Sequence, residues 1–504
     1  MRPVGPGFQP YQWAPSTEEL ARRAGLDPVE IVRFDGNVPP LPLPSSRPGA
    51  IAAALAEINT YPHGGYPFIH EAIAEYASVE PANVVLGAGA DDLIMLVARS
   101  YAGEGDTVSI PQSPTYPVYE VATQVAGAAV GEDAPVLTFL CRPGNTFGDL
   151  PTIPDARPLA VDEAYYEYSG GETAVGLIED GVVVIRTFSK AFALAGARIG
   201  YLLADKDTAR ELYDRQAPAQ VSTLSVALAL AALRTPPDVG AVIEERERLT
   251  EELRALGYAP LPSRANFVYV PVDDVDGAYE RLLARGCVVR RQPGGIRISV
   301  RDHDDDDMLL RALGGDEPRT SRAVRSVRAT AETTIRIRLG LDGAGRVHVG
   351  TGAGLYDHLL EQLAFHGGLD LVVEGVGDWE TGAHHTAEDT AIALGEAIDR
   401  ALGDRRGIAR YGSAVVPMDD ALARAAVDLG GRRGAEIALA EDPGLARHVL
   451  ESLANAARLT LHVSAEGRDA HHVAEAAFKA VGRALRDATR VGDTVELPST
   501  KGVL

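Results

Sequence analysis

The sequence predicts an α/β protein made of two folded regions that are joined by a short linker. In the first region, apolar β-branched runs such as 182–185 alternate with Ala- and Leu-rich stretches of helical periodicity, such as the run predicted to be helical from about 208 to 256. A short polar segment with glycine and proline follows at 314–321, a composition typical of a domain boundary. Beyond it the sequence changes to strands in which apolar and polar residues alternate. We therefore expect two domains, residues 1–315 and 325–504, with a linker at 316–324.

Composition and charge argue against several classes of protein. The chain of 504 residues is 46% hydrophobic and 24% charged, which is typical of a globular protein. Its net charge of −23 disfavours a nucleic-acid partner, because the phosphate backbone would be repelled. Two cysteines, Cys141 and Cys287, give no disulfide framework. No signal peptide is visible, and the longest small-apolar stretch, 224–233, is too short to span a membrane. We expect a cytoplasmic enzyme that acts on small molecules, with no nucleic-acid or membrane partner.

The most informative stretch lies at residues 187–198. A buried strand leads into a loop that carries one lysine, Lys190, with Arg198 eight residues further on. A lysine amine can form a Schiff base with an aldehyde, while the Ser189 hydroxyl and the Arg198 guanidinium can bind phosphate. A lone lysine after a strand is more often a surface residue, but here other motifs accompany it. Together these groups suit a phosphorylated carbonyl cofactor.

Residues 187–198 resemble the pyridoxal-phosphate lysine motif of fold-type I aminotransferases, most closely that of the histidinol-phosphate aminotransferase family. The resemblance implies a large and a small α/β lobe, and transamination in which Lys190 carries the α-proton. It also implies that Asp162 pairs with the pyridine nitrogen, while Tyr165 and Asn145 bond the phenolic oxygen. The positions that match the family's cofactor-binding residues are Tyr61, Ala90, Asp91, Tyr116, Asn145, Asp162, Tyr165, Ser189, Lys190 and Arg198.

Several of these matches also have plainer explanations. The glycine-rich turn before Ala90 and Asp91 could cradle phosphate at a helix N-terminus, yet such a turn is often a simple strand-to-helix connection. Tyr116 is expected to stack on the cofactor ring; a tyrosine packed in a proline-rich turn is the alternative. Tyr61, which in the family reaches the neighbouring subunit's cofactor, is equally well explained as a surface residue. An aspartate at a strand end often caps a helix, but the order and spacing of the motifs favour a cofactor role for Asp162.

Further observations concern the substrate and the size of the large lobe. Arg290 and Arg297 match the family's substrate-anion arginines, and a guanidinium suits a carboxylate or phosphate. Solvated strand arginines are the alternative, mainly for Arg290. Of the family's Asn-Glu-Asn segment only Asn37 remains. Because only 16 residues separate Asn145 from Asp162, too few for a complete crossover helix with its loops, we expect a shortened large lobe.

The last third of the chain carries a duplicated histidine motif. Residues 384–388 and 471–475 both read His-His-x-Ala-Glu, and they lie 87 positions apart, each at the start of an Ala-rich helix. On a helix the glutamate shares a face with both histidines. Imidazole and carboxylate ligands together suit Mn²⁺, Fe²⁺ or Zn²⁺. One copy could be a helix-capping pair, but two copies, with His358 and His448 as further candidates, indicate a metal site.

Residues 325–504 resemble imidazoleglycerol-phosphate dehydratase over nearly their whole length, notably at 351–358, 384–389, 471–479 and 498–502. The resemblance implies a duplicated α+β fold that binds two metal ions, usually manganese, and in which Glu475 or Glu332 takes the substrate proton. The implied metal ligands are His358, His384, His385, Glu388, His448, His471, His472 and Glu475. The implied substrate-binding residues are Glu332, Arg410, Arg432, Lys479, Ser499 and Lys501.

The two resemblances imply consecutive chemical steps. Dehydration of imidazoleglycerol phosphate gives imidazoleacetol phosphate, and transamination of that ketone with glutamate gives histidinol phosphate. We therefore expect a bifunctional enzyme of histidine biosynthesis that uses pyridoxal 5'-phosphate and Mn²⁺ and forms a homo-oligomer. The alternatives keep the dehydratase. In these alternatives the first half is an aminotransferase of another specificity, an enzyme similar to threonine-phosphate decarboxylase, or a non-catalytic scaffold.

Overall fold

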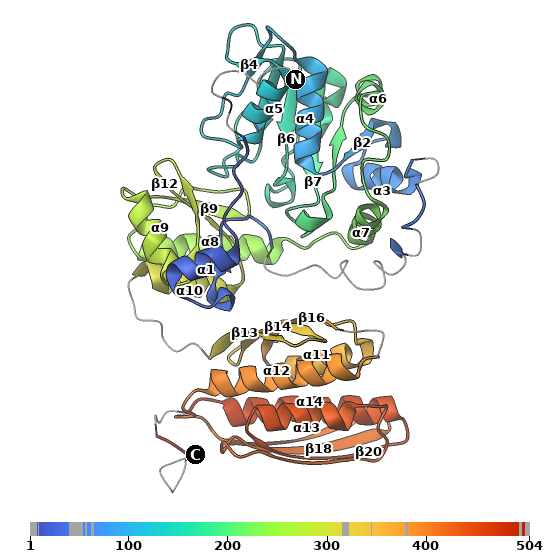
Figure 1. Ribbon diagram of the computed structural model, residues 1–504, viewed down its shortest axis with the longest axis vertical. Helices are drawn as coiled ribbons and strands as arrows, with labels where there is room; N and C mark the ends of the chain where they lie inside the picture. The colour runs from blue at the N-terminus through green and yellow to red at the C-terminus, as the bar shows by residue number, and fades with distance from the viewer. Residues whose placement is uncertain are drawn as a thin grey trace. The chain divides into compact units, whose positions relative to one another are not determined.

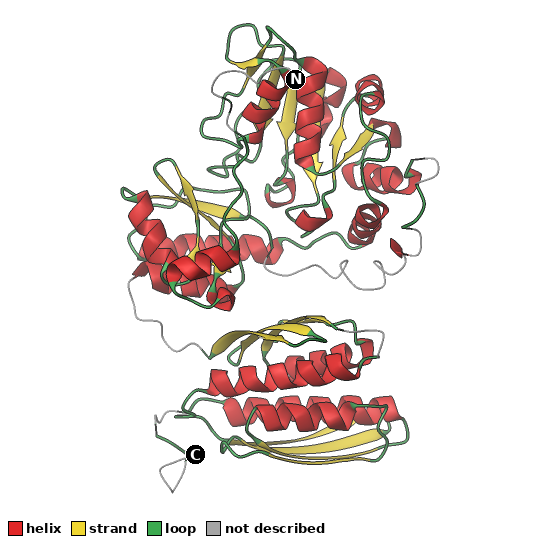
Figure 2. Cartoon of the chain, viewed as in Figure 1, coloured by secondary structure: helices red, strands yellow, loops and turns green. Residues whose placement is uncertain are grey.

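The computed structural model contains two compact units, Met1–Glu317 and Pro318–Leu504. Figure 1 labels their helices and strands, and Figure 2 distinguishes helix from strand. The linker expected at 316–324 lies outside the described residues up to position 321, and strand β13 already begins at Ala323. None of the described helices is both long and apolar enough to cross a membrane. The structure describes residues 8, 10–39, 54–55, 58–61, 65–314, 322–343, 345–377, 382–492 and 496–498.

A seven-stranded sheet forms the large lobe of the first unit. Strand β8 runs antiparallel to both of its neighbours, whereas the other neighbouring strands pair in parallel. The central strands are buried at every position, as expected for a sheet that helices cover on both faces. In spatial order the strands are β2 (Val84–Gly87), β8 (Gly200–Leu203), β7 (Val182–Thr187), β6 (Leu159–Asp162), β5 (Leu137–Cys141), β3 (Thr107–Ser109) and β4 (Ala129–Val130).

Helices pack against both faces of this sheet (Figure 1). Val182 and Val184 of β7 belong to the core that includes α3 and α7, while Val183 and Ile185 belong to the core that includes α4, α5 and α6. This alternation follows from the two-residue repeat of a strand. The region expected to be helical from 208 to 256 contains three separate helices, α6, α7 and α8. The bounds are α3 (Pro67–Ala77), α4 (Ala90–Tyr101), α5 (Val118–Ala126), α6 (Lys206–Asp214), α7 (Thr223–Arg234) and α8 (Gly240–Ala255).

The connection between β5 and β6 is short, as the sequence predicted. Residues 142–158 contain no helix, yet β6 pairs in parallel with β5, with Cys141 opposite Asp162. The chain therefore returns to the start of β6 without the helix that normally makes such a crossover. As a consequence, Asn145 and Asp162 come from a loop and a strand end that are adjacent at the carboxyl edge of the sheet.

The small lobe combines a short antiparallel sheet with helices and part of the N-terminal arm. The amide of Ser299, at the end of β12, donates to the carbonyl oxygen of Phe34 at 2.8 Å, so the arm runs beside this strand. The sheet has the order β11 (Arg290–Gln292), β12 (Gly295–Ser299) and β9 (Phe267–Pro271), and β1 (Val32–Arg33) pairs in parallel with β10 (Cys287–Val288). Helices α1 (Thr17–Ala24), α8, α9 (Val275–Leu283) and α10 (His303–Gly314) contribute to its core.

The second unit consists of two halves with one topology. Each half has a four-stranded sheet in which the third strand of the half lies at one edge and pairs in parallel with the fourth. The four helices lie between the two sheets (Figure 1). The first half contains β13 (Ala323–Ala329), β14 (Thr334–Gly340), β15 (Val347–Gly350), α11 (Gly354–Gly367), β16 (Asp370–Val376) and α12 (His384–Leu402). The second contains β17 (Tyr411–Met418), β18 (Ala421–Asp428), β19 (Gly434–Leu439), α13 (Ala446–Ala456), β20 (Thr460–Glu466) and α14 (Ala470–Thr489).

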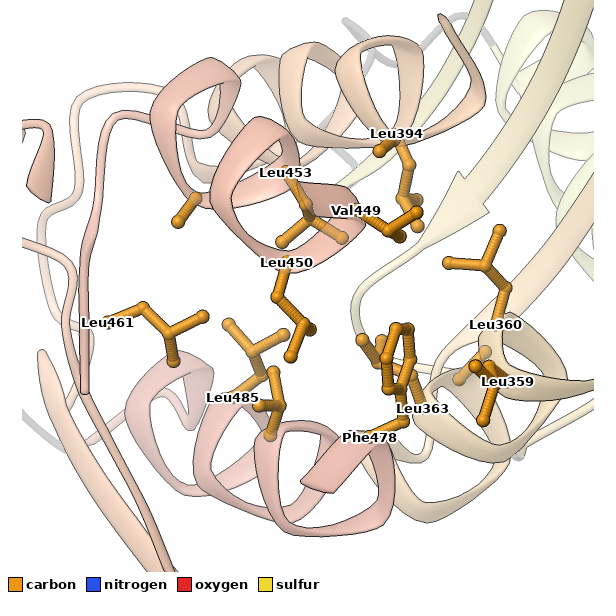
Figure 3. Close-up of a cluster of buried hydrophobic side chains, with 14 of the residues drawn as sticks. Leu359, Leu360, Leu363, Leu394, Val449, Leu450, Leu453, Leu461, Phe478 and Leu485 are labelled. Carbon is orange, nitrogen blue, oxygen red and sulfur yellow. The ribbon is translucent and has the colours of Figure 1, made fainter. Parts of the chain in front are cut away.

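Helices from different halves pack closely against each other, α11 against α14 and α12 against α13. A Cβ at Gly482 of α14 would lie 2.2 Å from the carbonyl oxygen of Leu363 in α11, and a Cβ at Gly395 of α12 would lie 2.5 Å from that of Leu453 in α13. The two glycines are 87 positions apart, the spacing of the histidine motifs. Figure 3 shows Leu363, Leu453 and Phe478 in the buried core that these contacts enclose. Glycine at both positions lets the helix backbones approach.

We expect Gly482→Ala to lower the free energy of unfolding of the second unit by about 1–3 kcal/mol, because the added methyl group would overlap the backbone of α11. Thermal unfolding followed by calorimetry measures the change. Gly354→Ala is the matched control, since its Cβ would meet nothing within 4 Å. Equal stability of the two variants would contradict the packing described for α11 and α14.

Candidate active sites

Lys190 lies in the turn after β7, at the carboxyl edge of the large-lobe sheet. Its Nζ donates to the carbonyl oxygen of Gly36 at 3.3 Å. Burial of the amine, together with the charge of Arg297, lowers its pKa to about 8, although the carboxylates of Asp91 and Asp162 oppose the shift. At neutral pH a much larger fraction of this amine is uncharged than in an exposed lysine, as a nucleophilic amine requires.

Asp162 is the last residue of β6 and is 3% exposed. The Tyr119 hydroxyl donates to its Oδ2 at 2.6 Å, and the amide of Ala164 donates to its Oδ1 at 3.0 Å. Burial raises the pKa of the carboxyl group to about 6, while these hydrogen bonds and the charge of Lys190 act in the opposite direction. Sequence reasoning did not include Tyr119. The only signal for it is its place three residues after Tyr116, at the start of a helix.

Tyr165 and Asn145 meet beside Lys190. The Tyr165 hydroxyl donates to Oδ1 of Asn145 at 2.8 Å and accepts from Nδ2 of Asn37 at 3.0 Å. Burial raises the pKa of Tyr165 to about 12, so the hydroxyl remains a donor. Asn37 is 1% exposed and adopts a left-handed backbone with φ of 51°. Its Oδ1 accepts from the Ser299 hydroxyl at 2.8 Å, so it links the N-terminal arm and the small lobe to the site.

The turn between β2 and α4 holds the groups expected to bind phosphate. Helix α4 begins at Ala90, where its first amides have no partner within the helix. Asp91 accepts from Arg198 at 3.0 Å and from the Tyr116 hydroxyl at 2.7 Å. A Cβ at Gly89, whose φ is +88°, would lie 2.8 Å from NH2 of Arg198, so only glycine lets the guanidinium approach the turn this closely.

The other residues expected near the phosphate differ in their surroundings. The Ser189 hydroxyl accepts from Oγ1 of Thr187 at 2.9 Å, just beyond β7. Thr187 was not part of the sequence-based set. Tyr61 is 82% exposed. Of the residues expected near the phosphate, the structure thus brings Ala90, Asp91 and Arg198 together at the turn between β2 and α4, whereas Tyr61 is exposed to solvent.

The two arginines expected to bind substrate anions occupy facing positions on β11 and β12. Arg290 and Arg297 are register partners. Arg297 is 6% exposed and donates to the carbonyl oxygen of Asn145 at 2.6 Å, and its buried Nε has no hydrogen-bond partner among the described residues. Burial lowers the pKa of its guanidinium. A buried donor without a partner is costly, and an anion would satisfy it.

A buried ion pair, Glu163–Arg186, joins the ends of β6 and β7. Glu163 follows Asp162, and Arg186 lies in β7, four residues before Lys190. The Arg186 guanidinium is 2.9 Å from Oε2 of Glu163 and 3.6 Å from the centre of the Tyr166 ring. Both charged side chains are almost completely buried. The pair ties β6 to β7 at the edge where the site forms.

In the second unit, His358, His471 and Glu475 form one cluster of possible metal ligands. Nε2 of His358 and Nε2 of His471 each lie 3.2 Å from Oε2 of Glu475. The two imidazole rings stack with centres 5.6 Å apart. His358 comes from α11 of the first half, whereas the other two residues come from α14 of the second, so the cluster depends on the packing of these helices.

His448, His384 and Glu388 form a second cluster in the equivalent place. Nε2 of His448 in α13 lies 3.4 Å from Oε1 of Glu388, and Nε2 of His384 lies 3.7 Å from its Oε2. The buried Nε2 of His448 has no hydrogen-bond partner among the described residues. In each cluster the ligand atoms lie within 4.8 Å of one another, which leaves room for an ion at ordinary metal–ligand distances.

The second histidine of each motif lies outside these three-residue clusters. Nδ1 of His385 is 3.3 Å from Glu332, in the turn between β13 and β14. Nδ1 of His472 is 2.7 Å from Oδ1 of Asp420, in the equivalent turn between β17 and β18. The structure thus brings six of the eight predicted ligands into two clusters. It also shows Asp420 as the counterpart of Glu332, a residue that sequence reasoning missed.

Among the residues expected to hold the substrate phosphate, those that the structure describes have different surroundings. Lys479 lies 2.6 Å from Oε1 of Glu475, at the first cluster. Arg410 donates to Asp428 at 2.7 Å and to the carbonyl oxygen of Pro498 at 2.8 Å. Arg432 is exposed. Ser499 and Lys501 lie outside the described residues.

The pKa of Lys190 predicts its reactivity in the cofactor-free chain. At pH 8.5 more than half of a group with a pKa of about 8 is neutral, compared with roughly 1% of an ordinary lysine. We therefore expect faster reductive methylation of Lys190 than of Lys206, which an exposed ion pair with Glu80 keeps charged. Peptide mass spectrometry after labelling across pH 6–10 measures both rates. Parallel pH profiles for the two lysines would contradict the assignment.

The ion pair beside the site predicts a large stability effect. Glu163→Ala would leave the Arg186 charge buried without its partner and is expected to lower the free energy of unfolding by about 3–5 kcal/mol. Asp276→Ala removes the acid of an exposed pair with Arg291 and should cost less than about 1 kcal/mol. Chemical denaturation compares the two variants. A small loss for Glu163→Ala would show that the pair does not tie β6 to β7.

Comparison with known proteins assigns both units to families. A model of the family "Aminotransferase class I and II" matches residues 30–134 and 143–313, more than half of the chain. Among solved structures, histidinol-phosphate aminotransferase from Sinorhizobium meliloti in complex with pyridoxal-5'-phosphate is 26% identical. The match has a TM-score of 0.53 and covers 60% of this chain and 95% of that one. The enzyme of the same name from Clostridium acetobutylicum, 23% identical with a TM-score of 0.52 over 56% of this chain and 98% of that one, supports the fold alone.

The second unit has closer relatives. A model of the family "Imidazoleglycerol-phosphate dehydratase" matches residues 351–485. The imidazoleglycerol-phosphate dehydratase of Salinispora tropica is 52% identical over an alignment of 205 residues, and the match covers 36% of this chain and 100% of that protein. That of Acidothermus cellulolyticus is 46% identical over 202 residues, covering 38% and 98%. The chain is therefore a fusion, a member of the class I and II aminotransferases in its first unit and of the imidazoleglycerol-phosphate dehydratases in its second.

Proposed function

We propose that the chain catalyses two consecutive steps of histidine biosynthesis. The second unit converts imidazoleglycerol phosphate to imidazoleacetol phosphate, and the first unit converts this ketone, with glutamate, to histidinol phosphate. The observation that carries the proposal is that one chain combines the Lys190 and Asp162 site with the two His-Glu clusters. Because the product of one reaction is the substrate of the other, the fusion is chemically coherent.

The residues of the first site fit pyridoxal 5'-phosphate. The Arg198 guanidinium, which the absence of a side chain at Gly89 allows close to the turn, and the first amides of α4 suit its phosphate. Asp162, a buried carboxylate whose pKa is raised to about 6, suits a cationic ring nitrogen as its partner. When bound, this cofactor withdraws electrons from the substrate's α-carbon. Ser189 would contribute to the phosphate site, and Tyr116 and Tyr61 would contact the cofactor, the latter from a neighbouring copy.

The protein's own groups perform the other tasks of transamination. The Lys190 amine, mostly neutral above a pH of about 8, would take the α-proton from the amino donor in one half-reaction and would deliver a proton to the carbon derived from the ketone in the other. Tyr165 and Asn145 orient the phenolic oxygen of the cofactor through their mutual hydrogen bond. Arg297 offers its Nε, which has no hydrogen-bond partner among the described residues, to the substrate's phosphate or carboxylate, with Arg290 beside it.

The residues of the second unit fit two divalent ions, which we take to be Mn²⁺. Each cluster offers two imidazoles and one carboxylate, a donor set that suits manganese, iron or zinc. When bound, such ions stabilise negative charge on the imidazole ring of the substrate. Glu332 is the better-placed proton acceptor, because its side chain is 54% exposed, whereas that of Glu475 is 9% exposed and already contacts two histidines and Lys479.

We further propose that the chain forms a homo-oligomer in the cytoplasm. Three protein ligands leave coordination positions of each ion open. His385 and His472 lie outside both clusters of their own chain, so another copy of the chain is the source from which they can complete the sites. The same assembly would gather Arg410, Arg432, Lys479, Ser499 and Lys501 around the substrate phosphate.

Mass spectrometry of the products tests both activities in one experiment. With Mn²⁺, pyridoxal 5'-phosphate, glutamate and imidazoleglycerol phosphate, we expect histidinol phosphate. Lys190→Ala should stop at imidazoleacetol phosphate, and His448→Ala should reduce the first step by at least about tenfold. His462→Ala, an exposed histidine on β20, is the control. Imidazoleacetol phosphate as the final product of the unaltered chain would mean that the first unit has another substrate or none.

Metal removal tests the dehydratase separately. Dialysis against a chelator should abolish formation of imidazoleacetol phosphate, and added Mn²⁺ should restore it. The clusters supply only the ligands, whereas the ions supply the positive charge that stabilises the substrate's imidazole ring. Transamination of supplied imidazoleacetol phosphate should persist in the chelated protein, since the first site contains no such cluster among the described residues. Full dehydratase activity after complete metal removal would refute the role assigned to the clusters.

A further inference from the structure

Tyr119, in helix α5, is buried between Phe139 of β5 and Asp162 at the end of β6. Its ring stacks on Phe139 with centres 5.2 Å apart and an interplanar angle of 14°. Tyr116 meets the same ring edge-on, with centres 5.8 Å apart. Held by these two contacts, the Tyr119 hydroxyl points at Oδ2 of Asp162 over a distance of 2.6 Å. A short hydrogen bond of this kind to a carboxylate is one of the stronger kinds.

The surroundings of Asp162 show what this hydrogen bond opposes. Burial is the dominant influence on the carboxyl group and favours its protonated form, and the charge of Asp91 acts in the same direction. The Tyr119 hydrogen bond is the largest influence that favours the ionised form, ahead of the Ala164 amide and the charge of Lys190. Cys141 faces Asp162 from β5, and its thiol contacts the carbonyl oxygen of Pro143.

We propose that Tyr119 is a positioning residue of the aminotransferase site, which keeps the Asp162 carboxylate ionised and aimed at the ring nitrogen of the cofactor. The inference rests on the proposed function of the first unit. Without the hydroxyl, the pKa of Asp162 would rise further and more of the acid would be neutral, and a neutral acid cannot hold the ring nitrogen in its protonated form. Because Tyr119 also packs against Tyr116, one side chain supports both the expected nitrogen partner and the expected ring-stacking residue.

Tyr119→Phe tests the proposal, since it keeps the ring and removes a single oxygen atom. We expect the dissociation constant for pyridoxal 5'-phosphate to rise about tenfold or more, the usual consequence of losing a hydrogen bond to a charged group. The pH at which the absorbance of the bound cofactor changes should move upward by about one unit. A ring without its positive charge makes the nitrogen that joins the cofactor to Lys190 easier to protonate. Absorbance titrations measure both quantities without an activity assay.

Tyr76→Phe is the matched control. It removes another tyrosine hydroxyl that donates to a carboxylate in the same lobe, Glu167 at 3.3 Å, away from Asp162. Its cofactor affinity and absorbance titration should match those of the unaltered chain. Circular dichroism and thermal unfolding of each variant show that the first unit is folded, and an unchanged dehydratase rate shows that the second unit is unaffected. Unchanged affinity and an unchanged titration in Tyr119→Phe would overturn the proposal.

A double-mutant cycle with Asp162→Asn tests whether Tyr119 acts through Asp162. If it does, Tyr119→Phe should weaken cofactor binding less than about twofold further in the Asp162→Asn background. Fully additive losses would refute the positioning role and mean that Tyr119 acts independently. An unaltered chain that does not bind pyridoxal 5'-phosphate would refute the proposed function itself, and this outcome is visible before any variant is compared.

Discussion

The parallel pairing of β6 with β7 is the constraint on which the aminotransferase site depends. It places Asp162 opposite Ile185, and Lys190 follows in the turn beyond β7. Both strands are buried at every position, so the charges at their ends are partly desolvated. Burial moves the pKa of the acid up to about 6 and that of the amine down to about 8, toward neutrality for both groups. The buried Glu163–Arg186 pair holds the same two strands together.

In the second unit, the candidate sites are positioned by the packing of one half against the other rather than by the pairing of two strands. Each candidate metal cluster combines a histidine from the shorter helix of one half with a histidine and a glutamate from the longer helix of the other. Gly395 and Gly482 set how closely these helices approach. The positions of the candidate ligands therefore depend on how the core packs. Metal binding is expected to stabilise the fold as well as to serve the reaction.

Much of this arrangement could be predicted from local sequence signals. The apolar run before Lys190, the strand ending at Asp162, and the helices that begin near His384 and His471 all appear in the structure. The short β5–β6 connection also followed from counting residues. Local patterns sufficed because strand burial, helix periodicity and loop length are properties of neighbouring residues. The expected helical run from 208 to 256 was too coarse, because it passed over the helix-breaking prolines Pro218, Pro236 and Pro237, which lie in the two interruptions.

The sequence by itself determined the two families, the order of their motifs and most of the charged residues of the candidate sites. Only the tertiary structure decided which of these residues meet. It joined Tyr119 to Asp162, brought Asn37 from the arm to Tyr165, and separated His385 and His472 from the clusters of their own chain. The physical reason is that such contacts join residues distant in sequence. Their distances follow from how sheets and helices pack, and no local pattern records that packing.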